Sequence, residues 1–173
     1  RILNPNKTFN TFRINTNYYA EFHNTTGMLQ QGQINIDVTS TSVKNDYYGL
    51  SVYVNPLETY DFYESRTFGR FVNIPKNIYG MFYFSSNYNR KFAVDIKPYA
   101  TVTNEDNRAN FGLVFAPRYR FSNRLLFNYQ FEIYSQKSDR GWVAANETDI
   151  IFAERDRRTI TNDFGMKYAL NPK

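Results

Sequence analysis

Residues 9–22 alternate between two kinds of side chain. One set takes every second position and is mostly apolar, while polar side chains stand between: Phe12, Ile14, Thr16, Tyr18, Ala20 and Phe22 against Arg13, Asn15, Asn17, Tyr19 and Glu21. Successive side chains of a β-strand point to opposite faces, so this segment predicts a strand with one apolar and one polar face. The apolar face then contacts either the core of a soluble sheet or the hydrocarbon of a membrane.

The same alternation returns in seven further segments along the chain. They cover residues 33–38, 48–55, 79–88, 92–101, 111–121, 125–134 and 160–170. The pattern therefore predicts an all-β fold with about eight strands, several of them long for a globular protein. Pro98 and Pro117 fall on the apolar face, and because proline cannot donate to a strand ladder we expect bulges or bends there, near a membrane interface.

The connections between these segments alternate between short and long. Short turns lie at residues 3–7, 44–46, 89–91, 122–124 and 171–173, and longer connections lie at 23–31, 55–77, 103–110 and 135–149. Outer-membrane barrels have short turns at one end of up-and-down strands and long loops at the other. We therefore expect an antiparallel up-and-down transmembrane β-barrel segment over residues 1–173, incomplete at both ends and part of a larger barrel.

Composition narrows the classes of function. Mean hydropathy is −0.61, and no apolar run approaches the roughly 18 residues of a membrane-spanning helix, whereas a barrel strand needs apolar side chains only at alternate positions. The absence of cysteine excludes disulfides and thiolate metal sites. The net charge of +5 is spread in both signs, which argues against a nucleic-acid surface. No signal-peptide pattern opens the sequence.

The densest cluster of charge is the ERDRR run at residues 154–158. Arg155, Arg157 and Arg158 could form a basic constriction that contacts anions, since arginine pairs bidentately with carboxylate and phosphate. Alternatively, these arginines pair with Asp156, Glu154 and other carboxylates and so hold the barrel wall together.

The connection around residues 58–71 combines aromatic rings with charges. Tyr63, Glu64, Arg66 and Arg70 are the candidate contacts in it, as a platform for a sugar or as part of a loop that folds inward as a plug. Trp142, in the other long connection, stacks on a glycan or anchors its loop.

Catalytic chemistry has weak support. Glycoside hydrolysis needs two carboxylates at a set separation, and Glu58, Asp61 and Glu64 qualify only by residue type. His23 is the single histidine, and no glycine-rich phosphate loop is present. We therefore expect no enzyme, no metal and no cofactor.

Residues 58–71, 83–99 and 150–173 carry a family resemblance. They resemble the uncharacterised C-terminal β-barrel domain of Gram-negative outer-membrane proteins whose N-terminal part is similar to a family-9 carbohydrate-binding module. The motif residues that match are Tyr63, Glu64, Arg66, Gly69 and Arg70, and then Arg155, Asp156, Arg157 and Thr159. One departure is Ala153-Glu154, where the family's usual pair is Gly-Arg.

The resemblance implies a location and a set of partners. The location is the outer membrane, and the partners are its lipid, other envelope proteins, and a glycan bound through a domain outside this sequence. The implied role is transport of carbohydrate-derived ligands or assembly in the envelope. The alternatives are a soluble or surface all-β module that binds glycan on its aromatic loops and, more remotely, an enzyme of glycan breakdown.

Overall fold

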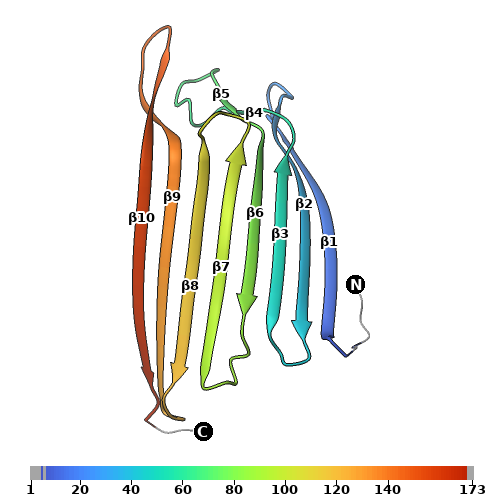
Figure 1. The fold of residues 1–173 in the computed structure, drawn as a ribbon. Helices are drawn as coiled ribbons and strands as arrows, with labels where there is room; N and C mark the ends of the chain where they lie inside the picture. The colour runs from blue at the N-terminus through green and yellow to red at the C-terminus, as the bar shows by residue number, and fades with distance from the viewer. Residues whose placement is uncertain (1–4, 6, 171–173) are drawn as a thin grey trace.

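A computed structural model of the chain describes residue 5 and residues 7–170 (Figure 1). The described residues form ten strands and no helix. The strands are β1 (Phe9–Phe22), β2 (Leu29–Ser42), β3 (Tyr47–Asn55), β4 (Thr59–Asp61), β5 (Val72–Ile74), β6 (Asn77–Ser85), β7 (Phe92–Thr103), β8 (Ala109–Arg120), β9 (Leu125–Ala145) and β10 (Ile150–Tyr168). Within the described part of the chain no helix is long and apolar enough to cross a membrane.

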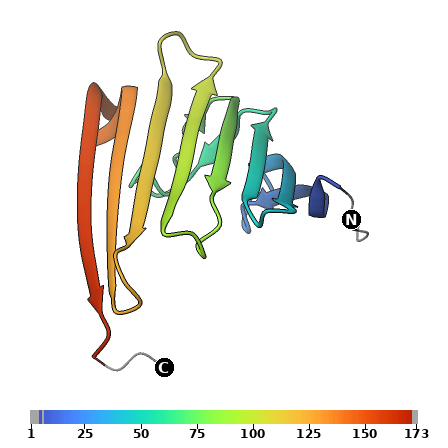
Figure 2. The ribbon, with the colours of Figure 1, turned by 60° about the horizontal axis from the view of Figure 1, so that its bottom comes forward.

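Eight of the strands form one antiparallel sheet in the order β1-β2-β3-β6-β7-β8-β9-β10. Each strand pairs with the next along the chain, and the short β4–β5 hairpin is inserted in the connection between β3 and β6. The sheet is curved and open, with β1 and β10 at its two edges (Figure 2). The expected all-β, up-and-down, antiparallel fold is thus confirmed, and the described strands do not close into a barrel.

The pairing register places the apolar side chains of all the long strands on one face. On one half of the sheet a row of paired residues on this face joins Ile14, Val38, Leu50 and Phe82. On the other half the row joins Pro98, Leu113, Ile133 and Ile160. The next row along the strands lies on the opposite face and joins Asn15, Asp37, Ser51, Met81, Tyr99, Gly112, Tyr134 and Thr159. Alternation in the sequence therefore becomes an apolar face and a polar face of the whole sheet.

Burial is the reverse of what a soluble domain shows. Large apolar side chains stay exposed on the apolar face, with Phe164 at 71%, Ile14 at 55% and Leu50 at 48%. The buried hydrophobic residues among those described are Ala93 and Val114, and both lie on the polar face, where they pair with Arg118 and Lys97. No layer of the described chain covers the apolar face.

The connection expected at residues 135–149 is mostly strand. β9 continues to Ala145 and β10 begins at Ile150, so that the turn itself is short. Register shifts occur between Ile151 and Phe152 and between Arg155 and Arg157, and Ser138 has a φ of 50°. The expectation of a long loop was wrong because this hairpin extends past the sheet, where a polar run at residues 135–140 is followed by a mostly apolar run at 141–145 and the alternation disappears.

The two prolines do not form the expected bulges. The register passes through Pro98 and Pro117 without a shift, although the β6–β7 pairing skips Phe82 and Tyr83 and the β8–β9 pairing skips Ala116 and Pro117. Each proline therefore interrupts the ladder locally without an inserted residue. The turns expected at 44–46, 89–91 and 122–124 are present. The expected alternation of short and long connections is wrong, because residues 23–28 and 104–108 form connections no longer than residues 86–91, and 56–76 is the long connection of the described chain. The turn expected at 3–7 falls largely outside the described residues, and the one at 171–173 falls wholly outside them.

Candidate functional site

Residues 56–76, here called the cross segment, connect β3 to β6 and form an ordered unit. Ser65 is fully buried, and its hydroxyl lies 3.1 Å from the carbonyl oxygen of Phe62 and 2.9 Å from that of Arg70. The Asp61 carboxylate accepts the amide N–H groups of Tyr63 (2.8 Å) and Glu64 (2.9 Å), which closes a tight turn. Asp61 thus has a structural use, although by residue type it is a candidate for catalysis.

One end of the cross segment packs on the β1–β2 side of the sheet. The His23 ring stacks on Phe62 with a centroid distance of 4.2 Å, and β4 lies against β2. A small cavity of about 140 Å³ lies between Glu21 and Gln31 on the sheet and Tyr63 on the cross segment. The single histidine is therefore part of the anchor of this segment.

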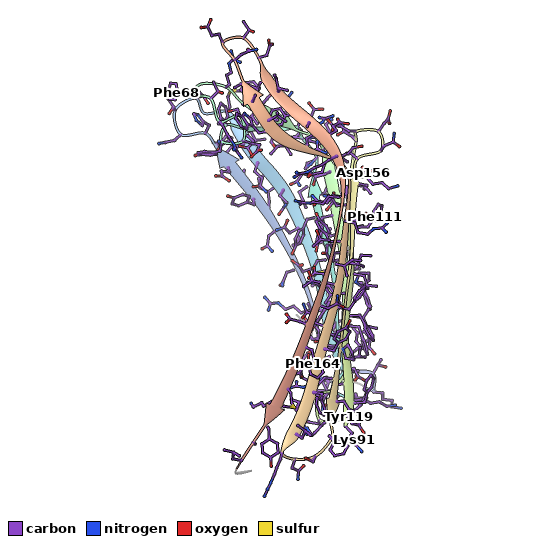
Figure 3. All side chains as sticks on the ribbon, turned by 90° about the vertical axis from the view of Figure 1, so that its left-hand side faces the viewer. Phe68, Lys91, Phe111, Tyr119, Asp156 and Phe164 are labelled. Atoms are coloured by element: carbon purple, nitrogen blue, oxygen red, sulfur yellow. The ribbon has the colours of Figure 1, made fainter. Side chains whose placement is uncertain are left out.

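The other end of the cross segment reaches the β9–β10 hairpin. The Arg70 guanidinium donates to the carbonyl oxygens of Thr148 (3.0 Å) and Glu147 (2.7 Å). The Arg66 guanidinium lies 4.8 Å from the centroid of the Trp142 ring, within range of a cation–π interaction. At this end of the sheet the hairpin leans toward the loop that carries Phe68 (Figure 3). The cross segment therefore bridges two sides of the curved sheet.

The candidate residues of the cross segment divide into two groups. Arg66 and Arg70 both contact the β9–β10 hairpin, Arg66 at the Trp142 ring and Arg70 at its turn. Tyr63 and Glu64 do not join them, because they lie on the part of the segment near β1 and β2. Tyr63 is 80% exposed.

The arginines of residues 154–158 do not gather at one point. Arg157 donates to the side-chain oxygen of Gln136 (2.7 Å from its Nε), and Arg155 pairs with Asp139 (3.3 Å). Arg158 pairs in register with Ser135 and so lies on the apolar face, opposite to its neighbour Arg157. Asp156 accepts the amide N–H of Ser138 (3.0 Å) at the irregular turn of β9. Three of the four residues thus contact β9, but Asp156 and Glu154 are not the partners of these arginines, and Arg155 is the one that pairs with a carboxylate among the described residues.

The profile of one protein family matches residues 1–173, and its description is "Domain of unknown function (DUF5916)". The chain belongs to the DUF5916 family. No curated protein and no solved structure matches it in the comparisons made with them.

An ion-pair network in this DUF5916 chain has no counterpart among the predicted site residues. Arg140 bridges Glu105 (2.8 Å) and Glu154 (2.9 Å), and Arg108 also pairs with Glu105 (2.9 Å). Burial of Glu105 acts to raise its pKa, but hydrogen bonds from Arg108 and Arg140 outweigh burial and hold the pKa below its ordinary value. The feature of the sequence that pointed to this network was the departure at Ala153-Glu154, since Glu154 supplies one of the two carboxylates that Arg140 contacts.

A ladder of tyrosine rings crosses the polar face of the DUF5916 sheet. Centroid distances are 5.3 Å from Tyr53 to Tyr79, 6.4 Å from Tyr79 to Tyr99 and 5.9 Å from Tyr99 to Tyr134. The hydroxyl of Tyr99 donates to Glu132 (3.0 Å). The signal in the sequence was the presence of aromatic rings at polar-face positions of several strands.

A cavity of about 330 Å³ also opens on the polar face, beside the interrupted ladder at Pro117. Asp95 and Asp163 line it, and the Arg118 guanidinium lies 4.6 Å from the centroid of the Tyr88 ring. Among the described residues no group of three His, Asp or Glu side chains is placed to hold a metal ion.

Proposed function

We propose that this chain is a wall segment of a membrane-spanning β-barrel of the outer-membrane type. Its apolar face contacts lipid, and its polar face lines the interior. The observation that carries the proposal is the inverted burial, with an exposed apolar row through Ile14, Leu50 and Ile160 and small or polar side chains buried on the other face. A soluble module would need a second layer over the apolar face, since large exposed apolar surface is unfavourable in water.

The height of the apolar face supports a bilayer as the contacting phase. On β7 the apolar-face positions run from Phe92 to Val102, which is ten residue steps. At roughly 3.3 Å per residue this is about 33 Å along the strand, and at a tilt of about 40° it is about 25 Å across the membrane. A lipid-facing band of about 25 Å is typical of outer-membrane barrels.

The distribution of charge on the apolar face also supports lipid contact. Lys137 and Arg158 lie on this face near the end of the sheet that carries the cross segment, here called the loop end. They are ten or more residues along their strands from Leu125 and Tyr168, which lie at the opposite end. Between these borders the apolar-face positions of the eight strands carry no Asp, Glu, Lys or Arg. Charges near the bilayer midplane cost about 2–4 kcal/mol each on a barrel surface, which explains their exclusion.

The proposed role is transport or assembly in the cell envelope. The cross segment covers one end of the sheet, and we propose that it restricts entry to the barrel as a plug held through Arg70 and Phe62. The proposed partners are outer-membrane lipid and other envelope proteins, with glycan bound through a domain outside this sequence. We propose no enzymatic activity and no nucleic-acid partner.

The test uses the absence of cysteine in the native sequence. Single cysteines replace Ile96 and Phe127 on the apolar face and Lys97 and Asn128 on the polar face, in the full-length protein within outer membranes. Probes at Ile96 and Phe127 should be quenched by a lipid-soluble quencher, and those at Lys97 and Asn128 should not. If Ile96 and Phe127 are shielded from both the lipid quencher and a membrane-impermeant thiol reagent, their face is covered by protein and the proposal fails.

A further inference from the structure

The two ends of the sheet differ in charge. The turns at residues 43–46, 86–91 and 121–124, together with Arg120 at the adjoining end of β8, hold five basic residues and one acidic residue: Lys44, Arg90, Lys91, Arg120 and Arg124 against Asp46. The connections at the opposite end, residues 23–28, 56–76, 104–108 and 146–149, hold seven acidic residues and four basic residues. The short-turn end is therefore basic and the loop end is not.

Few of the cations at the short-turn end take part in ion pairs. Four of the five ion pairs between described residues lie at the loop end, and the fifth joins Arg90 to Asp46 (2.9 Å). The other four cations of the short-turn end form no ion pair within the described chain, although Lys44 lies near enough to Asp46 to help lower its pKa, and we call them the basic collar: Lys44, Lys91, Arg120 and Arg124. Each collar residue is exposed.

The basic collar borders an aromatic band on the apolar face. The Lys91 ammonium lies 5.5 Å from the centroid of the Tyr119 ring, and both side chains lie on the same side of the sheet as Phe111 (Figure 3). Exposed rings beside them include Phe92 (54%) and Phe121 (64%). Such rings mark the level of the headgroups in membrane barrels.

We propose that the basic collar binds the phosphates of anionic phospholipids in the leaflet that surrounds the short-turn end. This inference rests on the proposed lipid-facing function, and it adds the class of lipid and the orientation of the protein. Guanidinium and ammonium groups attract anionic headgroups, and the attraction acts within about one Debye length of the surface. Nucleic acid fits less well, because it would leave the rings of Phe92 and Phe121 in water.

The test measures which lipid surrounds each end of the barrel. The full-length protein, with a single cysteine and fluorophore at Phe121 or at Val102, is placed in bilayers with brominated phosphatidylglycerol or brominated phosphatidylcholine as quencher. At Phe121, near the basic collar, phosphatidylglycerol should quench preferentially, by up to about fivefold for each cation that contacts the headgroups. At Val102, near the loop end, the preference should be weaker, since Lys137 and Arg158 are the cations on that part of the apolar face and acidic residues outnumber basic ones in the adjoining connections. High salt should reduce the preference.

Two double variants, each lacking two positive charges, test whether the collar causes the preference for phosphatidylglycerol. Lys91→Gln/Arg124→Gln should reduce the preference at Phe121, whereas Lys76→Gln/Lys137→Gln removes the same charge from the loop end and should leave it intact. Equal quenching by both lipids at Phe121, or a preference that persists in the first variant, overturns the collar while lipid contact stands. Absence of quenching by either lipid at both probes overturns the proposed function and this inference with it.

Discussion

The ring of Tyr99 occupies the space that a side chain at Gly112 would need. A Cβ atom on Gly112 would lie 2.1 Å from Cζ of Tyr99 and 2.5 Å from its hydroxyl oxygen. Tyr99 and Gly112 are paired neighbours on β7 and β8, so the ring crosses the glycine and reaches Glu132 beyond it. Glycine is therefore required at residue 112 for the close approach of the ring, because its backbone has no unusual φ.

We predict that Gly112→Ala destabilises the protein by about 1–3 kcal/mol, the usual range for overpacking. The ring of Tyr99 must move, which lengthens its hydrogen bond to Glu132. Denaturant unfolding in bilayers or detergent, followed by circular dichroism, measures the change. Gly80→Ala is the matched control, since a Cβ at Gly80 meets no atom within 4 Å. Equal loss of stability in the two variants would contradict the role of the ring.

Arg70 is the clearest link between the cross segment and the β9–β10 hairpin. Removing its two hydrogen bonds in Arg70→Gln should increase opening of the segment, since a hydrogen bond from a charged donor contributes about 1.5–3 kcal/mol. Cleavage by chymotrypsin next to the exposed Phe68 should then rise by at least about tenfold. Lys76→Gln removes the same charge from the same segment and should leave the cleavage rate unchanged. A rate unaffected by Arg70→Gln would show that other contacts hold the segment.

Asp46 links two short turns in a way that depends on pH. Its carboxylate accepts a hydrogen bond from the amide N–H of Asn87 (2.9 Å) and forms an ion pair with Arg90 (2.9 Å). The hydrogen bond from Asn87 is the largest cause that lowers the Asp46 pKa below its ordinary value of 3.8, with Arg90 adding to it and burial opposing it.

Because the folded-state pKa is lowered, the stabilisation is present above pH 3.8 and is lost as the pH falls through the folded-state value. We predict that the Asn87 amide loses protection from hydrogen exchange over this acidic range, after correction for the intrinsic exchange rate. In Asp46→Asn the protection should be lower at neutral pH and nearly independent of acidification. Protection that is insensitive to pH in the native protein would argue against the link.

The sheet could be predicted from the sequence because its signal is local. Ile14, Val38 and Leu50 each belong to a run in which apolar and polar residues alternate. The place of a residue in that alternation sets the face of the sheet on which its side chain lies, and it can be read without knowing the partner strand. The β9–β10 hairpin escaped prediction for the same reason. Beyond the sheet the polar and apolar residues of 135–149 come in blocks, SQKSDR and then GWVAA, so the two-residue period that identifies a strand is absent there.

The contacts of the candidate site are not local and leave little trace in the sequence. Arg70 donates to backbone carbonyl oxygens 77 and 78 residues away, and any residue type can supply a carbonyl. The fit of Tyr99 over Gly112 depends on the register of two strands, which the sequence alone does not set to one residue. Residue chemistry therefore identified Arg66, Arg70 and Trp142 as candidates, and the fold was needed to show that both arginines contact the hairpin that carries Trp142.

The Glu105 and Glu154 carboxylates both contact Arg140, but we predict unequal effects of their removal. Glu105 accepts from Arg108 as well as Arg140, and its side chain is 29% exposed, whereas Glu154 has Arg140 alone and is 55% exposed. Exposed ion pairs contribute about 0–1 kcal/mol because solvent screens them. Glu154→Gln should therefore change stability little, and Glu105→Gln should cost more, since it leaves two guanidinium groups with fewer partners.

The ranking can be measured by thermal unfolding of both variants with and without added salt. The double variant Glu105→Gln/Glu154→Gln tests whether the carboxylates act through the shared guanidinium. When Glu105 is already absent, Glu154 is the remaining partner of Arg140, so its removal should then cost more than it does in the native protein. Additive effects of the two substitutions, or a larger loss from Glu154→Gln alone, would mean that Arg140 does not couple the β7–β8 turn to the β9–β10 hairpin.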